Sequence, residues 1–195
     1  MTAVDERPIT GMAKTFEDLE VPEGLKAELL RGEIVMMAGP DRVHNRIVQS
    51  VQDQIPHKPW DRLQTQDLAI PGESSEPQPD LVVLERGAEE GPGRLIPAPA
   101  VELVLEVVSR TSGDRDYGVK RSMYAAGKVP AYLIVDPTSA QCVLLTHPTG
   151  SGEDADYRTV RTSKFGEPVP LPMLDVELDT SEFETLPGVR THRRP

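Results

Sequence analysis

The 195-residue chain suits one domain of medium size, and its 37% hydrophobic fraction, 19 prolines and 15 glycines indicate long connections around a compact core. No apolar run approaches the roughly 18 residues of a membrane span, and the N-terminus lacks the basic and apolar regions of a signal peptide. The single cysteine, Cys142, excludes an internal disulfide and fits a reducing compartment. We therefore expect a cytoplasmic protein without membrane contact.

The net charge of −11, from 32 acidic and 21 basic residues, opposes a broad basic face for nucleic acid. This leaves two interpretations open for a protein that binds nucleic acid. Either the ligand is not a long duplex, or the acids cluster elsewhere while one face gathers a set of basic residues: Lys14, Arg42, Arg46, Arg110, Arg115, Lys120 and Arg121.

The N-terminal part of the chain predicts a leader, a hairpin and a helix. Residues 1–14 show no periodicity and predict a disordered leader, and a capped helical turn is expected to begin at Thr15. Residues 28–37 hold two apolar runs around Gly32, which predicts a β-hairpin with that glycine in the turn. Residues 42–55 predict a helix with a single apolar stripe, formed by Val43, Ile47, Val48, Val51 and Ile55.

The middle of the chain predicts a sheet. Residues 63–70 alternate weakly and could form a strand, and residues 71–79 have the composition of a loop. Three apolar runs follow at 80–84, 101–108 and 131–135, and the second is apolar on both faces, as is typical of a central strand. A helix over about 114–127 joins the last two and predicts a right-handed crossover, with three residues toward the sheet: Val119, Met123 and Tyr124.

The C-terminal part predicts a strand over 142–146 paired with the one before it, an edge strand over 157–162 and a closing extended segment over 171–178. Residues 187–195 read as a basic tail. Together the elements predict a mixed α/β domain over residues 15–186, with a central mixed sheet flanked by helices and an N-terminal hairpin.

Two of the strand-like runs carry a carboxylate. Glu106 lies inside the central run, and Asp80 opens the run over 80–84. An unpaired buried carboxylate costs several kcal/mol or shifts its pKa, so each acid requires a partner. If the two strands are neighbours, their carboxylates converge across a spacing of about 4.8 Å. Magnesium binds such oxygen ligands and can activate a water for attack on a phosphodiester.

Simpler structural roles compete with these assignments. Asp80 could cap a turn after the preceding proline, and Glu106 could pair with a helix residue such as Arg121. Asp116 and Lys120 are one helical turn apart and could form a surface ion pair.

The order of these features resembles a known family. The chain is similar to the Uma-two family, whose members are assigned as restriction endonucleases within the PD-(D/E)XK nuclease superfamily. The resemblance runs from about residue 16 to residue 186. It rests on Glu28-Leu29-Leu30-Arg31-Gly32-Glu33, His44, Pro79-Asp80, Glu102-Leu103-Val104-Leu105-Glu106-Val107-Val108-Ser109, Asp116-x-x-x-Lys120-x-x-x-Tyr124, Gly127-x-Val129-Pro130-x-Tyr132 and Val135-Asp136-Pro137.

The resemblance implies a metal-dependent site on a restriction-endonuclease-like fold. Asp80 and Glu106 match the two metal-binding acids, and Glu33 matches an acid supplied from the hairpin as a further metal ligand or water positioner. The superfamily's usual lysine position is held here by Val108. The resemblance implies that Lys120, on the following helix, takes over that role and orients water or offsets charge on the phosphate.

Four further residues are candidates for phosphate contact or for support of the site. His44 could be structural or touch a phosphate, and Ser109 could contact phosphate or start the turn into the helix. Glu102 lies near the start of the central run and could support Glu106. Asp116 stands where a helix N-terminus favours negative charge.

The implied function is an endonuclease that hydrolyses nucleic acid, DNA rather than RNA, with Mg²⁺ or Mn²⁺. A homodimer is expected because two-strand cleavage needs two sites. The acidic balance and the vacated lysine position favour a competing function, a catalytically inactive binding or scaffold module on the same fold. A third class, a carboxylate-pair glycosidase, is disfavoured because an aromatic fraction of 4% with a single Trp60 leaves few platforms for sugars.

Overall fold

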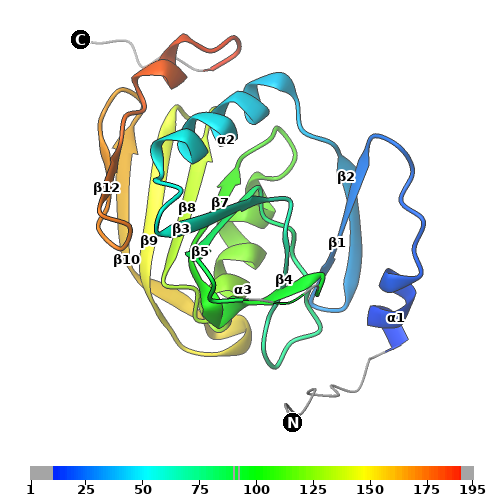
Figure 1. Cartoon of the computed structure of the whole chain (residues 1–195). Coiled ribbons are helices and arrows are strands. Elements are labelled where there is room, and N and C mark those ends of the chain that lie inside the picture. The colour runs from blue at the N-terminus through cyan, green and yellow to red at the C-terminus, as the bar shows by residue number, and fades with distance from the viewer. Residues whose placement is uncertain (1–10, 90, 92, 190–195) are drawn as a thin grey trace.

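A six-stranded mixed sheet forms the centre of the molecule. The computed structural model describes residues 11–89, 91 and 93–189. The strand order is β10-β9-β8-β7-β5-β3, with β7 and β8 parallel and all other neighbours antiparallel (Figure 1). The strands span Trp60–Gln64 (β3), Leu81–Glu85 (β5), Val101–Val107 (β7), Ala131–Asp136 (β8), Gln141–Thr149 (β9) and Asp156–Lys164 (β10).

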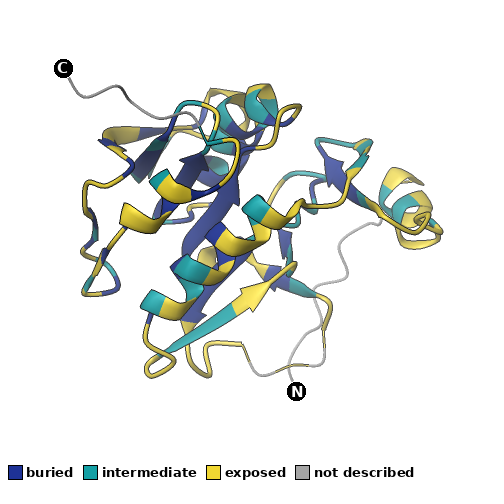
Figure 2. Cartoon of the chain, turned by 90° about the horizontal axis from the view of Figure 1, so that it is seen from above, coloured by how far each residue is buried: buried dark blue, intermediate teal, exposed yellow. Residues whose placement is uncertain are grey.

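Each face of the sheet is covered, so the sheet is buried in the middle of the fold (Figure 2). One face packs against α2 (Arg42–Gln54) and the hairpin of β11 (Val169–Leu171) and β12 (Val176–Leu178). The other face packs against α3 (Lys120–Ala126), with β4 (Asp67–Ala69) and β6 (Leu95–Pro97) at its edge. The architecture is the expected mixed α/β class, and β7 is a central strand as predicted.

The predicted hairpin is present and stands beside the sheet. It consists of β1 (Leu25–Leu30) and β2 (Glu33–Ala38), paired antiparallel. Arg31 and Gly32 connect them with φ of 51° and 80°, the backbone form that suits the twist of a two-residue hairpin. Figure 1 shows the hairpin at the opposite side of the molecule from β10 and β12, with α1 (Gly11–Glu17) beyond it.

The predictions for the first residues need correction. Residues 1–10 lie outside the described residues, but residues 11–14 belong to α1, so a disordered leader is wrong for them. Thr15 lies inside that helix, and its hydroxyl donates to the Gly11 carbonyl at 2.9 Å rather than capping a helix start. The helix has no buried residue, and it therefore carries no apolar stripe that sequence periodicity would reveal.

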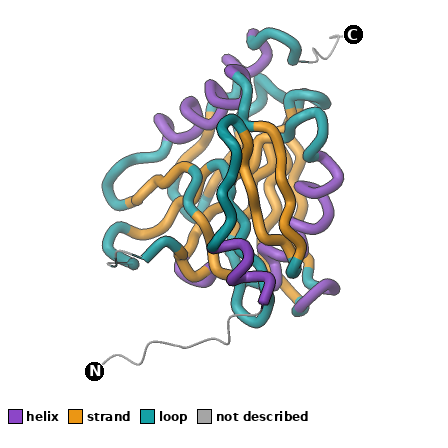
Figure 3. Tube along the Cα trace, turned by 90° about the vertical axis from the view of Figure 1, so that its right-hand side faces the viewer, coloured by secondary structure: helices purple, strands orange, loops and turns teal. Residues whose placement is uncertain are grey.

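Two other segments contain more strands than predicted. The run over 63–70 is divided between β3 and β4, because the backbone turns at Thr65 with a φ of 51°. The segment 171–178 is not one extended stretch, since it belongs to the β11–β12 hairpin, which turns at Asp175 with a φ of 54°. Figure 3 shows how much of the remaining chain is loop between short strands.

The helix after β7 begins differently from the prediction. Its first turn is the π-helical segment η2 (Arg115–Val119), in which the Lys120 amide donates to the Arg115 carbonyl five residues back. The extra residue rotates the following helix, so Val119 is 37% exposed rather than facing the sheet. Met123 and Tyr124 are buried as predicted, and Lys120 turns inward with them.

At the C-terminal end, the basic tail lies mostly outside the described residues, beyond residue 189. The start of the predicted tail is not free of contacts, because Val189 packs against the core on the α2 face. In the described part of the chain, no helix is both long and apolar enough to cross a membrane.

Candidate metal and phosphate site

Asp80 and Glu106 lie at the same end of two neighbouring strands. The β5–β7 register pairs Leu81 with Leu105 and Val82 with Val104, and Asp80 and Glu106 are the next residues along the two chains. The Asp80 amide donates to the Leu105 carbonyl at 3.1 Å, and the Asp80 side chain accepts from the Val107 amide at 2.8 Å, so Asp80 is held against this end of β7. The condition set by the sequence, that the two acidic strands be neighbours, is therefore met.

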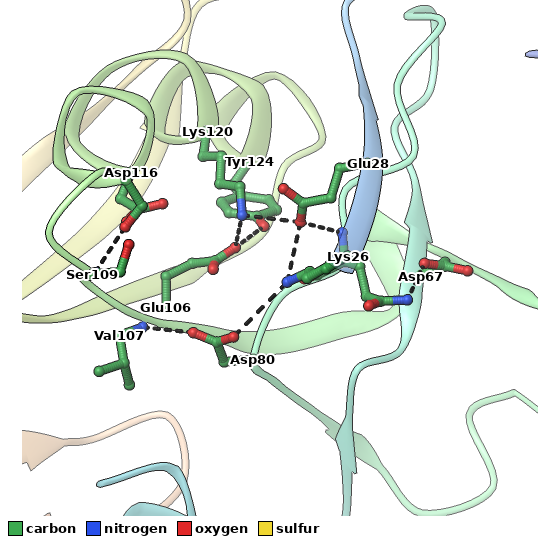
Figure 4. A network of polar contacts seen from close by, with 12 residues as sticks. Lys26, Glu28, Asp67, Asp80, Glu106, Val107, Ser109, Asp116, Lys120 and Tyr124 are labelled. Carbon is green, nitrogen blue, oxygen red and sulfur yellow. Dashed lines mark hydrogen bonds and ion pairs between the residues drawn. The ribbon is translucent and has the colours of Figure 1, made fainter. Parts of the chain in front are cut away.

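Glu106 is held by two donors from α3. The Lys120 ammonium lies 2.7 Å from Glu106 Oε1, and the Tyr124 hydroxyl donates to the same oxygen at 2.6 Å (Figure 4). Glu106 is 3% exposed and Lys120 is 2% exposed. Both side chains are inside the protein because η2 turns this face of the helix toward the sheet.

A third buried carboxylate comes from the hairpin. Glu28 on β1 is fully buried, and its Oε1 accepts from Lys120 Nζ at 3.0 Å and from the Gln78 amide at 2.9 Å. Lys26 Nζ lies 3.4 Å from the same oxygen. Glu28 Oε2 is buried with no hydrogen-bond partner. Lys120 therefore bridges the hairpin and the central strand.

Asp80 is oriented through one of its two oxygens. Asp80 Oδ2 accepts from the Val107 amide at 2.8 Å and from His44 Nε2 at 2.9 Å. His44 lies in the first turn of α2, where the Asp41 side chain caps the helix by accepting the His44 amide at 2.9 Å. Asp80 Oδ1 lies 3.9 Å from Lys26 Nζ, too far for a hydrogen bond. This oxygen is left for another ligand.

The protonation states follow from burial and charge. Burial raises the pKa of Glu106 to about 8, with Asp80 adding to the rise and Lys120 opposing it. Burial would also raise the pKa of Glu28, but Lys120 and Lys26 bring it below its usual value. Glu28 is thus ionised at neutral pH, whereas Glu106 holds a proton when no further cation is present. Both donors bind Glu106 Oε1, which leaves Oε2 as the oxygen that can carry this proton.

Asp80 and Lys120 remain charged. Burial opposes the ionisation of Asp80, but the hydrogen bond and charge of His44, with Lys26, lower its pKa. Burial would lower the pKa of Lys120, but Glu106 and Glu28 raise it above the ordinary value. We assign Lys120 as protonated in either state of Glu106, because Glu28 stays ionised beside it.

A cavity of about 350 Å³ opens onto these groups. Lys26, His44, Asp80, Glu106 and Lys120 line its inner part. The segment after β7 and the start of η2 form another wall, which contains Val108, Ser109, Arg110, Thr111, Ser112, Arg115 and Asp116. The volume lies within the range of small-molecule sites.

Ser109 and Asp116 form the turn at this wall. The Ser109 amide donates to Ser112 Oγ at 2.9 Å, and Ser112 Oγ donates to Asp116 Oδ2 at 2.5 Å. Burial raises the pKa of Asp116. The surface ion pair with Lys120 is a wrong interpretation, because Asp116 is 2% exposed and Lys120 binds Glu28 and Glu106 instead.

Two predicted site residues are not brought to the cavity. Glu33 is exposed beside the hairpin turn and does not line the cavity, so the structure does not bring it to Asp80 and Glu106. Glu28 is the hairpin acid that contacts Lys120. Glu102 is four residues before Glu106 on β7, about 13 Å along the strand, and does not support it. Arg121 binds Asp156 at 2.5 Å and is not the partner of Glu106.

Glu28 and Lys26 were not among the predicted site residues, although the sequence contains a signal for Glu28. Glu28 stands in the run Ala27-Glu28-Leu29-Leu30, a carboxylate inside apolar sequence, as Glu106 does. The same burial argument that singled out Glu106 would have selected Glu28. Lys26 is two residues earlier and therefore on the same side of the strand.

The basic residues gather at the cavity only in part. Arg110, Arg115 and Lys120 line it. Arg46 instead binds Glu182 on the surface at 3.0 Å. Lys26 also lines the cavity, and four acids lie beside these basic groups: Asp41, Asp80, Glu106 and Asp116. The cavity is therefore a mixed charged site rather than one edge of a broad basic face.

The donor set fits a magnesium ion bound through two carboxylates. Among the described residues, no three His, Cys, Asp or Glu side chains are already grouped as a ligand set. Within the same residues, Asp80 Oδ1 and Glu106 Oε2 accept no hydrogen bond. Magnesium keeps several waters and is commonly held by one or two carboxylates together with substrate phosphates. Asp80 and Glu106 can supply those ligands.

Comparisons with known proteins show the family and the fold of the chain. The model of the Uma2 family, described as "Putative restriction endonuclease", matches residues 13–181. A crystal structure described as a "putative nuclease belonging to DUF820", from Anabaena variabilis ATCC 29413, has the same fold with a TM-score of 0.68. It shares 13% sequence identity, and the match covers 88% of this chain and 96% of that chain. No curated protein matches the sequence.

Proposed function

The chain belongs to the Uma2 family, and on that premise we propose that it is a divalent-metal-dependent endonuclease of the PD-(D/E)XK type. The observation that carries the proposal is that Asp80, directly before β5, and Glu106, on the neighbouring strand β7, line one cavity together with Lys120. The proposed substrate is nucleic acid, DNA in preference to RNA, in keeping with the family's description.

In this proposal, Asp80 and Glu106 hold Mg²⁺ or Mn²⁺. The ion supplies an activated water and offsets charge on the phosphate. His44 and the Val107 amide fix Asp80 Oδ2, which leaves Oδ1 as the oxygen that would hold the ion. Lys120 and Tyr124 hold Glu106 Oε1, so Glu106 would bind the ion through its deprotonated Oε2.

Lys120 has a further donor to offer. An ammonium has three N–H donors, and Glu28 and Glu106 accept two of them. The third is available to a water or phosphate oxygen in the cavity. Glu28 positions Lys120 and keeps it charged. A lysine on the central strand would be positioned by the strand, whereas Lys120 comes from α3 and is positioned by Glu28.

The proposal extends to assembly and location. A homodimer would place two such sites on the two strands of a duplex. A cytoplasmic location is supported by Cys142, a free and buried thiol whose pKa burial raises to about 12.

A second function is favoured by one specific observation. The cluster is internally compensated without a metal, because Lys120 lies between Glu28 and Glu106 and both acids receive further hydrogen bonds. A scaffold or binding module could keep this network for stability alone. The two functions differ in whether the cavity performs chemistry.

Cleavage assays distinguish them. A mixed panel of single-stranded, duplex and RNA substrates is incubated with Mg²⁺ and with Mn²⁺, comparing the wild type with Glu106→Gln and Lys120→Met. We expect each variant to lose on the order of 100-fold or more in rate. Glu102→Gln, on the same strand but away from the cavity, is the matched control and should cleave as the wild type does. Equal cleavage by all four proteins would indicate contamination and exclude the nuclease function at this site.

A further inference from the structure

Arg115 differs from the arginines on the rest of the surface. Its side chain is half-buried on the wall of the cavity, and its Nε is buried without a hydrogen-bond partner. Within the described residues it forms no ion pair, as is also true of several exposed arginines, but among those residues Arg115 is the arginine that has a buried nitrogen without a partner. Arg46, Arg94 and Arg121 each bind a carboxylate. A buried donor that lacks an acceptor is unfavourable, so Arg115 is poised for an acceptor that comes from outside the chain.

The acids near Arg115 do not fill this role. Asp116 follows it in sequence, but the Asp116 carboxylate accepts from Ser112 inside the protein. Asp80 lines the same cavity, but its Oδ2 accepts from His44 and the Val107 amide, and no ion pair joins Asp80 to Arg115. In a protein with 32 acidic residues, an unpaired guanidinium on a cavity wall indicates that its counter-ion is a ligand.

The groups around Arg115 suit a phosphate. Arg110 lies in the same segment, is exposed and lines the cavity. The hydroxyls of Ser109 and Thr111 lie on the same wall, and the Thr111 amide already donates to Ser109 Oγ at 3.4 Å, which leaves the Ser109 hydroxyl proton free to donate. Guanidinium groups match phosphate oxygens with two parallel donors, which a lysine does not do.

We propose that Arg115, with Arg110, forms a second phosphate-binding subsite of this cavity. It takes a backbone phosphodiester that neighbours the one placed at Asp80 and Glu106, and the inference rests on the proposed nuclease function for the identity of that ligand. One cavity contains both groups, so a single bound strand can occupy both. The subsite explains how an acidic protein binds nucleic acid, since two or three local contacts replace a basic face.

Binding without metal tests the subsite independently of cleavage. A fluorescein-labelled single-stranded DNA dodecamer is titrated in EDTA by anisotropy, at several salt concentrations and with inorganic phosphate as competitor. The proteins are the wild type, Arg115→Gln, Arg115→Lys and the control Arg121→Gln, whose guanidinium lies with Asp156 away from the cavity. Thermal melting checks that each variant is folded.

We expect Arg115→Gln to weaken binding about tenfold and to lower the salt slope by roughly 0.7, the value for one lost phosphate contact on a single strand. Arg115→Lys should recover part of the affinity, and Arg121→Gln should bind the oligonucleotide as the wild type does. Phosphate should compete with the oligonucleotide only in proteins that retain Arg115. Equal affinities for Arg115→Gln and Arg121→Gln, or a wild type that binds no oligonucleotide, would overturn the subsite.

The outcomes separate this inference from the proposed function. Arg115-dependent binding with no cleavage in Mn²⁺ would reject the nuclease and keep the subsite. Cleavage that requires Glu106, with KM and Kd unchanged by Arg115→Gln, would keep the nuclease and reject the subsite.

Discussion

Glu28 and Lys120 form a buried ion pair between segments 92 residues apart, with Glu28 Oε1 lying 3.0 Å from Lys120 Nζ. The pair joins the N-terminal hairpin to the helix that follows the central strand. Burial of two charges costs free energy unless each is compensated, and here Lys26, Gln78 and Glu106 complete the compensation. The hairpin therefore contributes residues to the site.

Removal of the Glu28 charge should destabilise the protein. We expect Glu28→Gln to lower the free energy of unfolding by about 2 kcal/mol, less than the roughly 3–5 kcal/mol of a fully unpaired buried charge because Glu106 can ionise in its place. Urea denaturation measures the change. Glu33→Gln, on the exposed end of the same hairpin, should stay within about 0.5 kcal/mol of the wild type. Similar losses in both variants would contradict the buried ion pair.

The stability of the metal-free protein should fall as pH rises through the range set by Glu106. Its pKa is about 8 in the folded state and about 4.5 when unfolded, so the folded state binds the extra proton between these values. Unfolding then releases a proton, and the free energy of unfolding declines with pH by up to about 1.4 kcal/mol per unit. Chemical denaturation at pH 5, 6, 7 and 8 should show the decline in the wild type and a flatter profile in Glu106→Gln. Parallel profiles would mean that Glu106 is ionised at neutral pH without metal.

Metal binding should release a proton. Because the ion replaces the proton on Glu106 Oε2, the apparent affinity for Mn²⁺ should rise between pH 6 and pH 8. Calorimetry in two buffers with different ionisation enthalpies measures the released proton at pH 7. Asp80→Asn should abolish binding, and Glu33→Gln should leave it unchanged. Binding that is independent of pH, or equal in Asp80→Asn, would exclude the two-carboxylate site.

His44 should act through Asp80. We expect His44→Gln to reduce Mn²⁺ affinity by about 10-fold to 100-fold, because Asp80 Oδ2 loses its side-chain donor and the carboxylate is free to rotate. His57, exposed in the loop after α2, provides the control substitution His57→Gln. Loss of kcat in His44→Gln with unchanged Mn²⁺ affinity would instead indicate direct contact of His44 with the substrate.

The local sequence predicted the features that depend on nearest neighbours. An apolar run with flanking turn residues identified β7, and a carboxylate inside it singled out Glu106. The two apolar segments around Gly32 identified the hairpin. The metal-binding roles of Asp80 and Glu106 stay predictions.

Helical periodicity alone could not show which face of the helix after β7 is buried. The π-turn of η2 shifts the phase by one residue, so that Val119 faces out while Asp116 and Lys120 face in. Such a turn has no strong signature in composition, because packing against the sheet and the hairpin stabilises it.

The sequence by itself therefore determined the hairpin, α2, the central strands and the burial of Glu106, because burial of a strand and of its carboxylate follows from the residues on either side. Only the tertiary structure decided that Glu28 rather than Glu33 is the acid from the hairpin, that Lys120 is buried and that Arg115 is left unpaired. These depend on how the hairpin and helix are placed against the sheet. That placement depends on buried charges that come from distant segments and compensate one another. No local sequence pattern contains this information.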